Sequence, residues 1–229
     1  MRNRPHRENL LTETKGTTKI ARQRPPRFEL IAGNVSLDFV NTLDDRHIEP
    51  KELIETYPDL VRFGEDAGLL SSPQADRLFE RSYLEPDLAA RALDDARELR
   101  EAIHDVFWAI MNQHPAPPAA LARLNADAQA AAGHMHLVAT KNGFEWRFDD
   151  FRGFDSLLWP IARAAVDLLA SDQLTYVRPC LSKTCEWFFL DTSKNHHRRW
   201  CDMTRCGNRA KVQRFYVRKK KGSANASSS

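Results

Sequence analysis

The placement of the cysteines constrains this 229-residue chain more than any other feature of its sequence. All four lie in the last quarter, as two pairs with four residues inside each pair and fifteen between the pairs: Cys180, Cys185, Cys201 and Cys206. Paired cysteines at this spacing are typical of tetrahedral Zn²⁺ coordination. Four thiolates fill the coordination shell and leave no position for water, so we expect one structural Zn²⁺ rather than a catalytic one.

Composition favours a folded cytoplasmic protein. Hydrophobic residues make up 42% of the chain, which is enough for a sizeable core. No apolar run approaches the roughly 20 residues that a membrane span needs. The basic N-terminus has no apolar segment behind it, as a secretory leader would have. We therefore expect a cytoplasmic location and no membrane partner.

Three other accounts of the cysteines are open. Two disulfides would fit the even count, but stable disulfides are rare in the cytosol. His196 and His197 lie between the pairs, and an imidazole can replace a thiolate, although four cysteines already complete the shell. Four buried cysteines without a metal are the third account. A segment this small cannot bury enough apolar surface alone, so we expect the metal to supply most of its folding free energy.

Charge is segregated along the chain. Residues 1–27 hold eight Lys/Arg and two Asp/Glu, and residues 178–229 hold thirteen Lys/Arg and three Asp/Glu. Residues 28–177 hold thirteen Lys/Arg and twenty-six Asp/Glu. The net charge is therefore +6 for the N-terminal segment, −13 for the middle and +10 for the C-terminal segment. A basic end joined to an acidic body predicts a module that binds a polyanion, on a carrier that does not itself bind nucleic acid.

Apolar periodicity predicts a mostly helical body. Helical spacing recurs over residues 35–43, 51–69, 71–83, 86–113, 118–132 and 155–170. Asn142-Gly143 lies between two apolar segments and predicts a β-hairpin over about 137–146, because Asn-Gly supplies the positive φ angles of a tight turn. A β-like stretch, 175–178, leads into the first cysteine.

The predicted fold class is α+β, mostly helical. Residues 28–174 form a helical N-terminal domain with a small β-hairpin, and residues 175–218 form a C-terminal zinc module. Residues 1–27 and 219–229 are basic or Ser/Ala-rich, and we expect them to be disordered tails.

A basic helix is predicted after the last cysteine. Val212, Phe215 and Tyr216 gather on one side of it. Beside them runs a stripe of cations, Lys211, Arg214 and Arg218, and the zinc loops and first helical turn add Arg198, Arg199, Arg205 and Arg209. Such a surface is typical of phosphate-backbone binding, and a merely solvated face is the alternative. We predict that these seven cations contact DNA.

Aromatic residues around the zinc loops have two interpretations. The second cysteine is followed by Trp187, Phe188, Phe189 and Leu190, and Trp200 precedes the third. These side chains could form a mini-core packed over the metal, which we prefer for Phe188 and Leu190. Stacking on exposed nucleic-acid bases is the alternative.

The N-terminal domain shows no catalytic motif. Residues 28–177 match no phosphate loop, dinucleotide fingerprint, nucleophile elbow or metalloprotease helix, so we expect no enzyme. Charged and amide side chains near apolar segments are candidates to line a small-molecule pocket: Asp38, Asn41, Arg46, Arg97 and Arg100. The alternative, which we favour, is a polar network that fixes helix packing.

Two segments resemble known families. The Cys-Gly-Asn-Arg motif at 206–209, preceded by Cys-Glu-Trp-Phe-Phe-Leu-Asp at 185–191 and Arg-Arg-Trp-Cys at 198–201, resembles the CGNR zinc-finger family of bacterial proteins. Leu-Asp-Phe-Val-Asn-Thr-Leu at 37–43 resembles the opening signature of the ABATE domain, which usually precedes that finger. Together the resemblances cover about residues 28–218.

The resemblance implies a largely helical domain, a treble-clef-like zinc finger and a stress-induced transcription regulator. The predicted function is therefore zinc-dependent DNA binding, with an N-terminal domain that senses a small-molecule effector or forms a homodimer. One alternative is an adaptor whose basic finger docks on an acidic protein. Another is an enzyme that acts on a small molecule in the N-terminal pocket.

Overall fold

The computed structural model describes residues 28–46, 48–213 and 215–216. The helical body comprises α1 (Val35–Val40), β1 (Leu43–Asp44), β2 (Lys51–Glu52), α2 (Tyr57–Asp66), α3 (Ser72–Leu84), α4 (Pro86–Met111), α5 (Pro118–Gly133), β3 (Met135–Thr140), β4 (Gly143–Phe148) and α6 (Leu158–Leu169). The C-terminal part comprises a 3-10 turn (Asp172–Tyr176), β5 (Val177–Pro179), β6 (Phe188–Leu190), a π-helical turn (Met203–Gly207) and a helix over 208–213 and 215–216. The expected tails, 1–27 and 219–229, lie outside the described residues.

The mostly helical α+β class is confirmed, and α3, α4 and α5 begin within one residue of the predicted positions. The helix predicted over 155–170 begins three residues later, at Leu158 of α6. Prolines occupy the first turns of α3, α4 and α5, where a missing N–H removes no helical hydrogen bond. In α6, Pro160 is the third residue and is tolerated for the same reason. The β-like stretch at 175–178 is confirmed only from Val177, because the 3-10 turn occupies the two residues before it.

The helix expected over 51–69 is wrong in its first part. β2 instead pairs antiparallel with β1, and α2 begins only after Thr56. The reason is local: the Asp59 carboxylate accepts a hydrogen bond from the Thr56 N–H at 2.8 Å, and Pro58 lies in the first turn. This capping box fixes a helix start that periodicity alone does not locate.

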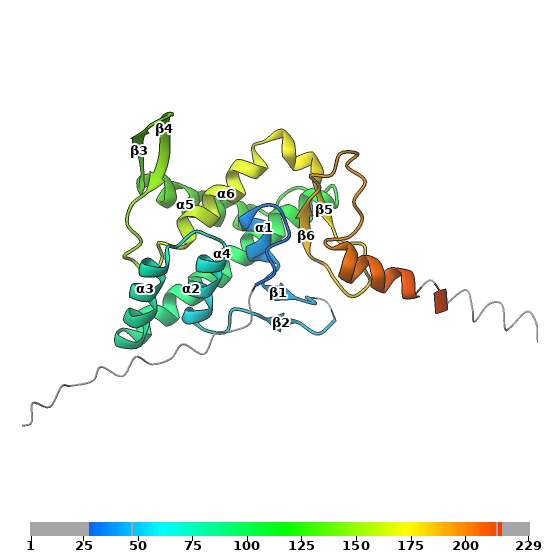
Figure 1. Cartoon of the computed structure of the whole chain (residues 1–229), viewed down its shortest axis with the longest axis horizontal. Coiled ribbons are helices and arrows are strands. Elements are labelled where there is room, and N and C mark those ends of the chain that lie inside the picture. Colours follow the sequence, from blue (N-terminus) through cyan, green and yellow to red (C-terminus); the bar gives the residue numbers. More distant parts are fainter. Residues whose placement is uncertain (1–27, 47, 214, 217–229) are drawn as a thin grey trace, which may run out of the picture.

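The predicted hairpin is confirmed as β3–β4, with a correction to its turn. The strands pair antiparallel around the two-residue loop 141–142. The positive φ angle belongs to Gly143, at 134°, and not to Asn142. Figure 1 shows the hairpin projecting from the body beside α5 and α6.

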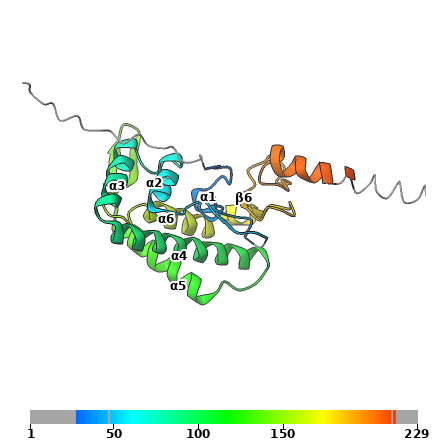
Figure 2. The same ribbon diagram turned by 90° about the horizontal axis from the view of Figure 1, so that it is seen from below.

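The longest helix, α4, organises the core. It contacts α1, α2, α3, α5 and α6, and Figure 2 shows it running along the whole body beneath α1 and α6. Its inward residues Leu99, Ile103 and Phe107 are fully buried. None of the helices within the described ranges is long and apolar enough to cross a membrane.

The C-terminal finger packs onto the body through the same core. The buried side chains of β6 and the four cysteines belong to one hydrophobic cluster with residues of the body helices. The ring of His104 on α4 stacks on Phe188 of β6, with 5.3 Å between ring centres. The finger and the helical body therefore share a continuous core, and the mini-core predicted for Phe188 and Leu190 is part of it.

Candidate metal centre and basic surface

The four cysteines approach one another from two turns of the finger. Cys180 follows β5, and Cys185 lies on the return path to β6. Cys201 ends a long loop, and Cys206 lies in the π-helical turn that opens the C-terminal helix. One pair in a turn between paired strands and one at a helix start is the arrangement expected of a treble-clef-like finger.

The geometry of the sulfur atoms fits zinc. The four Sγ atoms lie within 4.8 Å of one another, and all four residues are buried. The Sγ atom of Cys201 lies 3.6 Å from those of Cys185 and Cys206. A tetrahedron with Zn–S bonds of about 2.3 Å separates its sulfur atoms by about 3.8 Å, whereas a disulfide would bring two of them to about 2 Å. The four residues therefore fit one tetrahedral Zn²⁺ and not two disulfides.

Crowding of the thiols also calls for a cation. Hydrogen bonds from the side chains of Cys185 and Cys201 lower the pKa of the Cys180 thiol. The contact with Cys180 raises the pKa of the Cys185 and Cys201 thiols. Without a cation, therefore, these neighbouring thiols oppose one another's ionisation. A divalent ion is what allows all four sulfurs to be ionised together.

The two histidines between the cysteine pairs lie outside the metal cluster. His196 stacks on Tyr176, with 3.8 Å between ring centres, and its Nδ1 lies 2.7 Å from the carbonyl oxygen of Asp191. His197 is exposed. Among the described residues, the group that could hold a metal consists of the four cysteines.

Asp191 shapes the long zinc loop, a role that sequence reasoning did not assign. Its buried carboxylate accepts hydrogen bonds from the Ser193 N–H at 3.0 Å and the Arg198 N–H at 2.8 Å. The signal available in the sequence was the residue type, because Asp commonly caps the backbone of a turn.

Two of the predicted DNA-contacting arginines make contacts within the protein. The guanidinium of Arg198 lies 4.6 Å from the centre of the Phe189 ring and donates to the carbonyl of Trp200 at 2.9 Å. Arg205 forms an ion pair with Glu29 and lies 5.8 Å from the centre of the Trp187 ring. Both arginines therefore help to hold the finger in shape or against the body.

The structure leaves other cations of the finger facing outward. Arg199 and Lys211 are exposed. Arg209 is exposed and donates to the Thr184 hydroxyl at 2.6 Å. Lys183, which sequence reasoning missed, is also exposed and lies inside the first cysteine pair. Arg214 and Arg218 lie outside the described residues.

The aromatic residues divide between core and surface. Phe188 and Phe189 are fully buried and Trp187 nearly so, which agrees with packing rather than base stacking. Trp200 is only partly buried. The helix face predicted to be apolar is 55% exposed at Val212, 64% at Phe215 and 62% at Tyr216, and so remains open to solvent among the described residues.

Two of the predicted pocket residues instead join the finger to the body. The Asn41 side chain donates to the carbonyl of Phe188 and accepts from the N–H of the same residue, both at 2.9 Å. The Asp38 carboxylate accepts from the Ala32 N–H at 2.9 Å, and the Ala32 carbonyl accepts from the Leu190 N–H at 2.7 Å. Burial raises the pKa of Asp38 to about 6, although its backbone hydrogen bonds oppose the shift.

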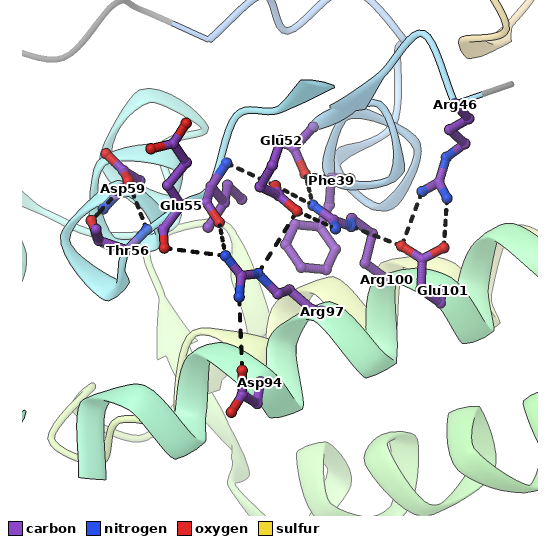
Figure 3. Close-up of polar contacts among 12 residues, drawn as sticks. Phe39, Arg46, Glu52, Glu55, Thr56, Asp59, Asp94, Arg97, Arg100 and Glu101 are labelled. Carbon is purple, nitrogen blue, oxygen red and sulfur yellow. Dashed lines mark hydrogen bonds and ion pairs between the residues drawn. The ribbon is translucent and has the colours of Figure 1, made fainter. Parts of the chain in front are cut away.

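The other three predicted pocket residues form ion pairs along α4 and the loop before α2 (Figure 3). Arg100 is buried and makes a bidentate contact with Glu52, at 2.6 and 2.7 Å. Burial of Glu52 raises its pKa, but hydrogen bonding to Arg100 leaves the pKa below its ordinary value. Arg46 pairs with Glu101 at 2.5 Å.

Arg97 donates to the carbonyls of Ile54 and Glu55, at 3.0 and 3.1 Å. All five candidates thus have partners within the protein, and these contacts match the packing network that we favoured. A ligand pocket at these residues stays a prediction.

Comparison with known proteins covers nearly the whole described chain. A family model named ABATE, with the description "Putative stress-induced transcription regulator", matches residues 33–172. The model of the CGNR zinc finger matches residues 176–219. None of the curated proteins matches the chain. The finger match and the sulfur geometry agree that the four cysteines hold one structural Zn²⁺.

Proposed function

The chain belongs to the ABATE family, and from this membership we propose that it is a zinc-dependent DNA-binding protein that regulates transcription. The observation that carries the proposal is the surface of the finger. Arg199 of the long loop is an exposed cation, and Arg209 and Lys211 are exposed cations of the C-terminal helix. This helix projects away from the body in both views (Figures 1 and 2).

The zinc ion, the exposed cations of the finger and the acidic body have different roles in this proposal. Bound zinc supplies folding free energy to the finger. The outward cations then neutralise phosphates and release counterions, so affinity falls steeply with salt. The acidic body, with a net charge of −13 over residues 28–177, repels DNA and favours approach through the finger. The proposal assigns the chain no catalytic step.

We further propose that the N-terminal domain forms a homodimer through the β3–β4 hairpin. Cross-strand pairing places Leu137 opposite Trp146, and Phe144 shares their face because side chains alternate along a strand. These residues are 54%, 63% and 74% exposed. A two-stranded sheet is marginally stable alone, and a two-fold axis would cover this face with its own copy. Such a dimer would present two fingers to DNA.

A substitution on this face tests the dimer. Trp146→Lys places a charge in the proposed contact and should convert the dimer to monomer in sedimentation equilibrium. Arg147→Ala, on the opposite face of the same strand, should leave the dimer intact. A wild-type chain that sediments as a monomer at micromolar concentration would refute the dimer without touching the proposal for the finger.

The DNA-binding proposal is tested by selection of the zinc-loaded chain against a random duplex pool at near-physiological salt, with a chelated control. We expect one enriched sequence motif that disappears on chelation. If no sequence motif is enriched and only salt-sensitive background binding is seen, the proposed role as a transcription regulator is contradicted. A co-purifying acidic protein would then support the adaptor.

A further inference from the structure

A groove lies between the first cysteine turn and the C-terminal helix of the finger. Its volume is about 420 Å³, within the range of small-molecule sites. Residues 181–184 form one wall, and Arg199 with Trp200 complete the lining. The other wall is formed by Arg209, Ala210, Val212 and Gln213 of the C-terminal helix. The Arg209 side chain spans the groove, because it donates to the Thr184 hydroxyl at 2.6 Å.

The charge of the groove is of one sign. Lys183, Arg199 and Arg209 line it, and no acidic residue does so among the residues that the structure describes. Asp45 of the helical body interacts electrostatically with Arg209 but does not line the groove. Three cations around one concavity are suited to an anion that carries more than one charge.

The groove is also apolar and aromatic. Leu181 and Val212 are each 55% exposed on its walls. Trp200 is partly buried, and the Arg199 guanidinium lies 5.5 Å from the centre of its ring. A cation beside an aromatic ring is the surface on which nucleic-acid bases stack. The exposed Gln213 amide offers both a donor and an acceptor to the edge of a base.

We propose that this groove binds an unstacked base of single-stranded nucleic acid, with the flanking phosphates on Lys183, Arg199 and Arg209. The inference deepens the proposed function and rests on it. An anionic ligand with a flat apolar part matches both the charge and the lining, and a nucleotide unit has both. An unbroken duplex hides the faces of its bases, so it can offer only phosphates to this groove.

The test compares three probes at fixed salt, using the zinc-loaded full chain and fluorescence anisotropy. The probes are a single strand of ten thymidines, a ten-residue abasic strand with the same phosphates, and the duplex of ten thymidines with ten adenosines. We expect the abasic strand to bind about 5- to 140-fold more weakly than the thymidine strand, because one base–aromatic stack contributes about 1–3 kcal/mol. Because the protein is unchanged, misfolding cannot produce this difference.

Variants locate the effect. Trp200→Leu keeps an apolar side chain but removes stacking. It should lower the affinity for the thymidine strand by a similar factor and leave the affinity for the duplex unchanged. Trp200→Phe should restore most of the affinity. Lys194→Ala removes an exposed cation of the long loop, outside the groove. It should lower the affinity for all three probes by the same factor. Zinc content, one ion per chain, verifies that each variant is folded.

The outcomes separate the two proposals. Equal affinity for the thymidine and abasic strands would contradict base binding in the groove. So would a Trp200→Leu substitution that lowers the affinities for the thymidine strand and for the duplex by the same factor. Duplex binding that survives this result leaves the proposed function standing. Failure of the zinc-loaded chain to bind any of the three probes overturns both.

Discussion

Single residues hold the finger against the helical body. Asn41 mimics a strand partner for the backbone of Phe188, 147 residues later in the chain. Both side-chain atoms and both backbone groups are buried. An unsatisfied buried backbone group costs about 1–3 kcal/mol, so the amide is the side chain that this position requires.

Replacement of Asn41 should therefore destabilise the protein through the junction. We expect Asn41→Ala to lower the free energy of unfolding by about 2–4 kcal/mol, because two buried backbone groups lose their partner. Urea denaturation measures the loss, and faster hydrogen exchange of the Phe188 amide locates it. Asn195→Ala, at an exposed loop position, should stay within about 0.5 kcal/mol of wild type. Equal stabilities of the two variants would rule out the junction role.

The buried carboxyl of Asp38 predicts a pH dependence. Its pKa is about 6 in the folded protein against 3.8 for an unperturbed group, so the folded state binds the proton more tightly. Its contribution to stability therefore falls as pH rises through 6, by about 1.4 kcal/mol between pH 5 and pH 8. Asp38→Asn keeps the acceptor for Ala32 and should remove this slope. Unfolding curves for wild type and variant that run parallel across this window would contradict the assignment.

The polar residues of the 37–43 signature show what sequence reasoning could and could not reach. Residue type and neighbouring apolar segments assigned Asp38 and Asn41 to a ligand pocket or to a polar packing network. Their partners are backbone groups of the N-terminal segment and of the finger, and no local pattern points to them. These contacts agree with the packing alternative, but their partners were not predictable from the sequence.

At the scale of elements, close contacts decide which small residues are required. A Cβ atom at Gly64 of α2 would lie 2.4 Å from the Cδ1 atom of Leu157 and 3.1 Å from that of Leu70. Leu157 is fully buried, so any shift of its side chain would disturb the surrounding core. At Gly133, the last residue of α5, an added Cβ atom would meet nothing within 4 Å. Two helical glycines in one chain thus predict opposite responses to the same substitution.

Gly64→Ala should destabilise the protein. Overpacking against a buried side chain costs about 1–3 kcal/mol, which outweighs the gain of up to about 1 kcal/mol in helix propensity. Gly133→Ala should be neutral or stabilising by up to about 1 kcal/mol. Urea midpoints of the two variants give the comparison, and a Gly64→Ala variant as stable as Gly133→Ala would show that α2 does not pack as described.

Element prediction succeeded where the end signals of an element are local. The prolines in the first turns of α3, α4 and α5 located the starts of these helices, and the Asn-Gly turn located the hairpin. The first part of the helix predicted over 51–69 is absent because a tertiary strand pair and a local capping box together override its periodicity. Glu52 is held in a strand pair and on Arg100, and the Thr56 capping box starts the helix later.

At the scale of the whole molecule, the zinc finger and the helical body share one core, and their charges oppose one another. The cysteine spacing was sufficient to predict the zinc ligands, because coordination fixes the chemistry. The sequence could not divide the arginines by role. Arg205 pairs with Glu29, 176 residues away, while Lys183 and Arg199 remain exposed. Only the folded structure shows which cations pair within the protein and which face solvent.

The measurement that tests zinc-dependent DNA binding most directly is the affinity of the full chain for a duplex across a series of salt concentrations, with zinc bound and with zinc chelated. Basic residues outside the finger are present in both samples, so the comparison isolates the folded finger. We predict that the logarithm of the association constant falls linearly with the logarithm of salt concentration, and that chelation weakens binding at least about tenfold. Unchanged affinity on chelation, or an affinity that does not respond to salt, would contradict this function.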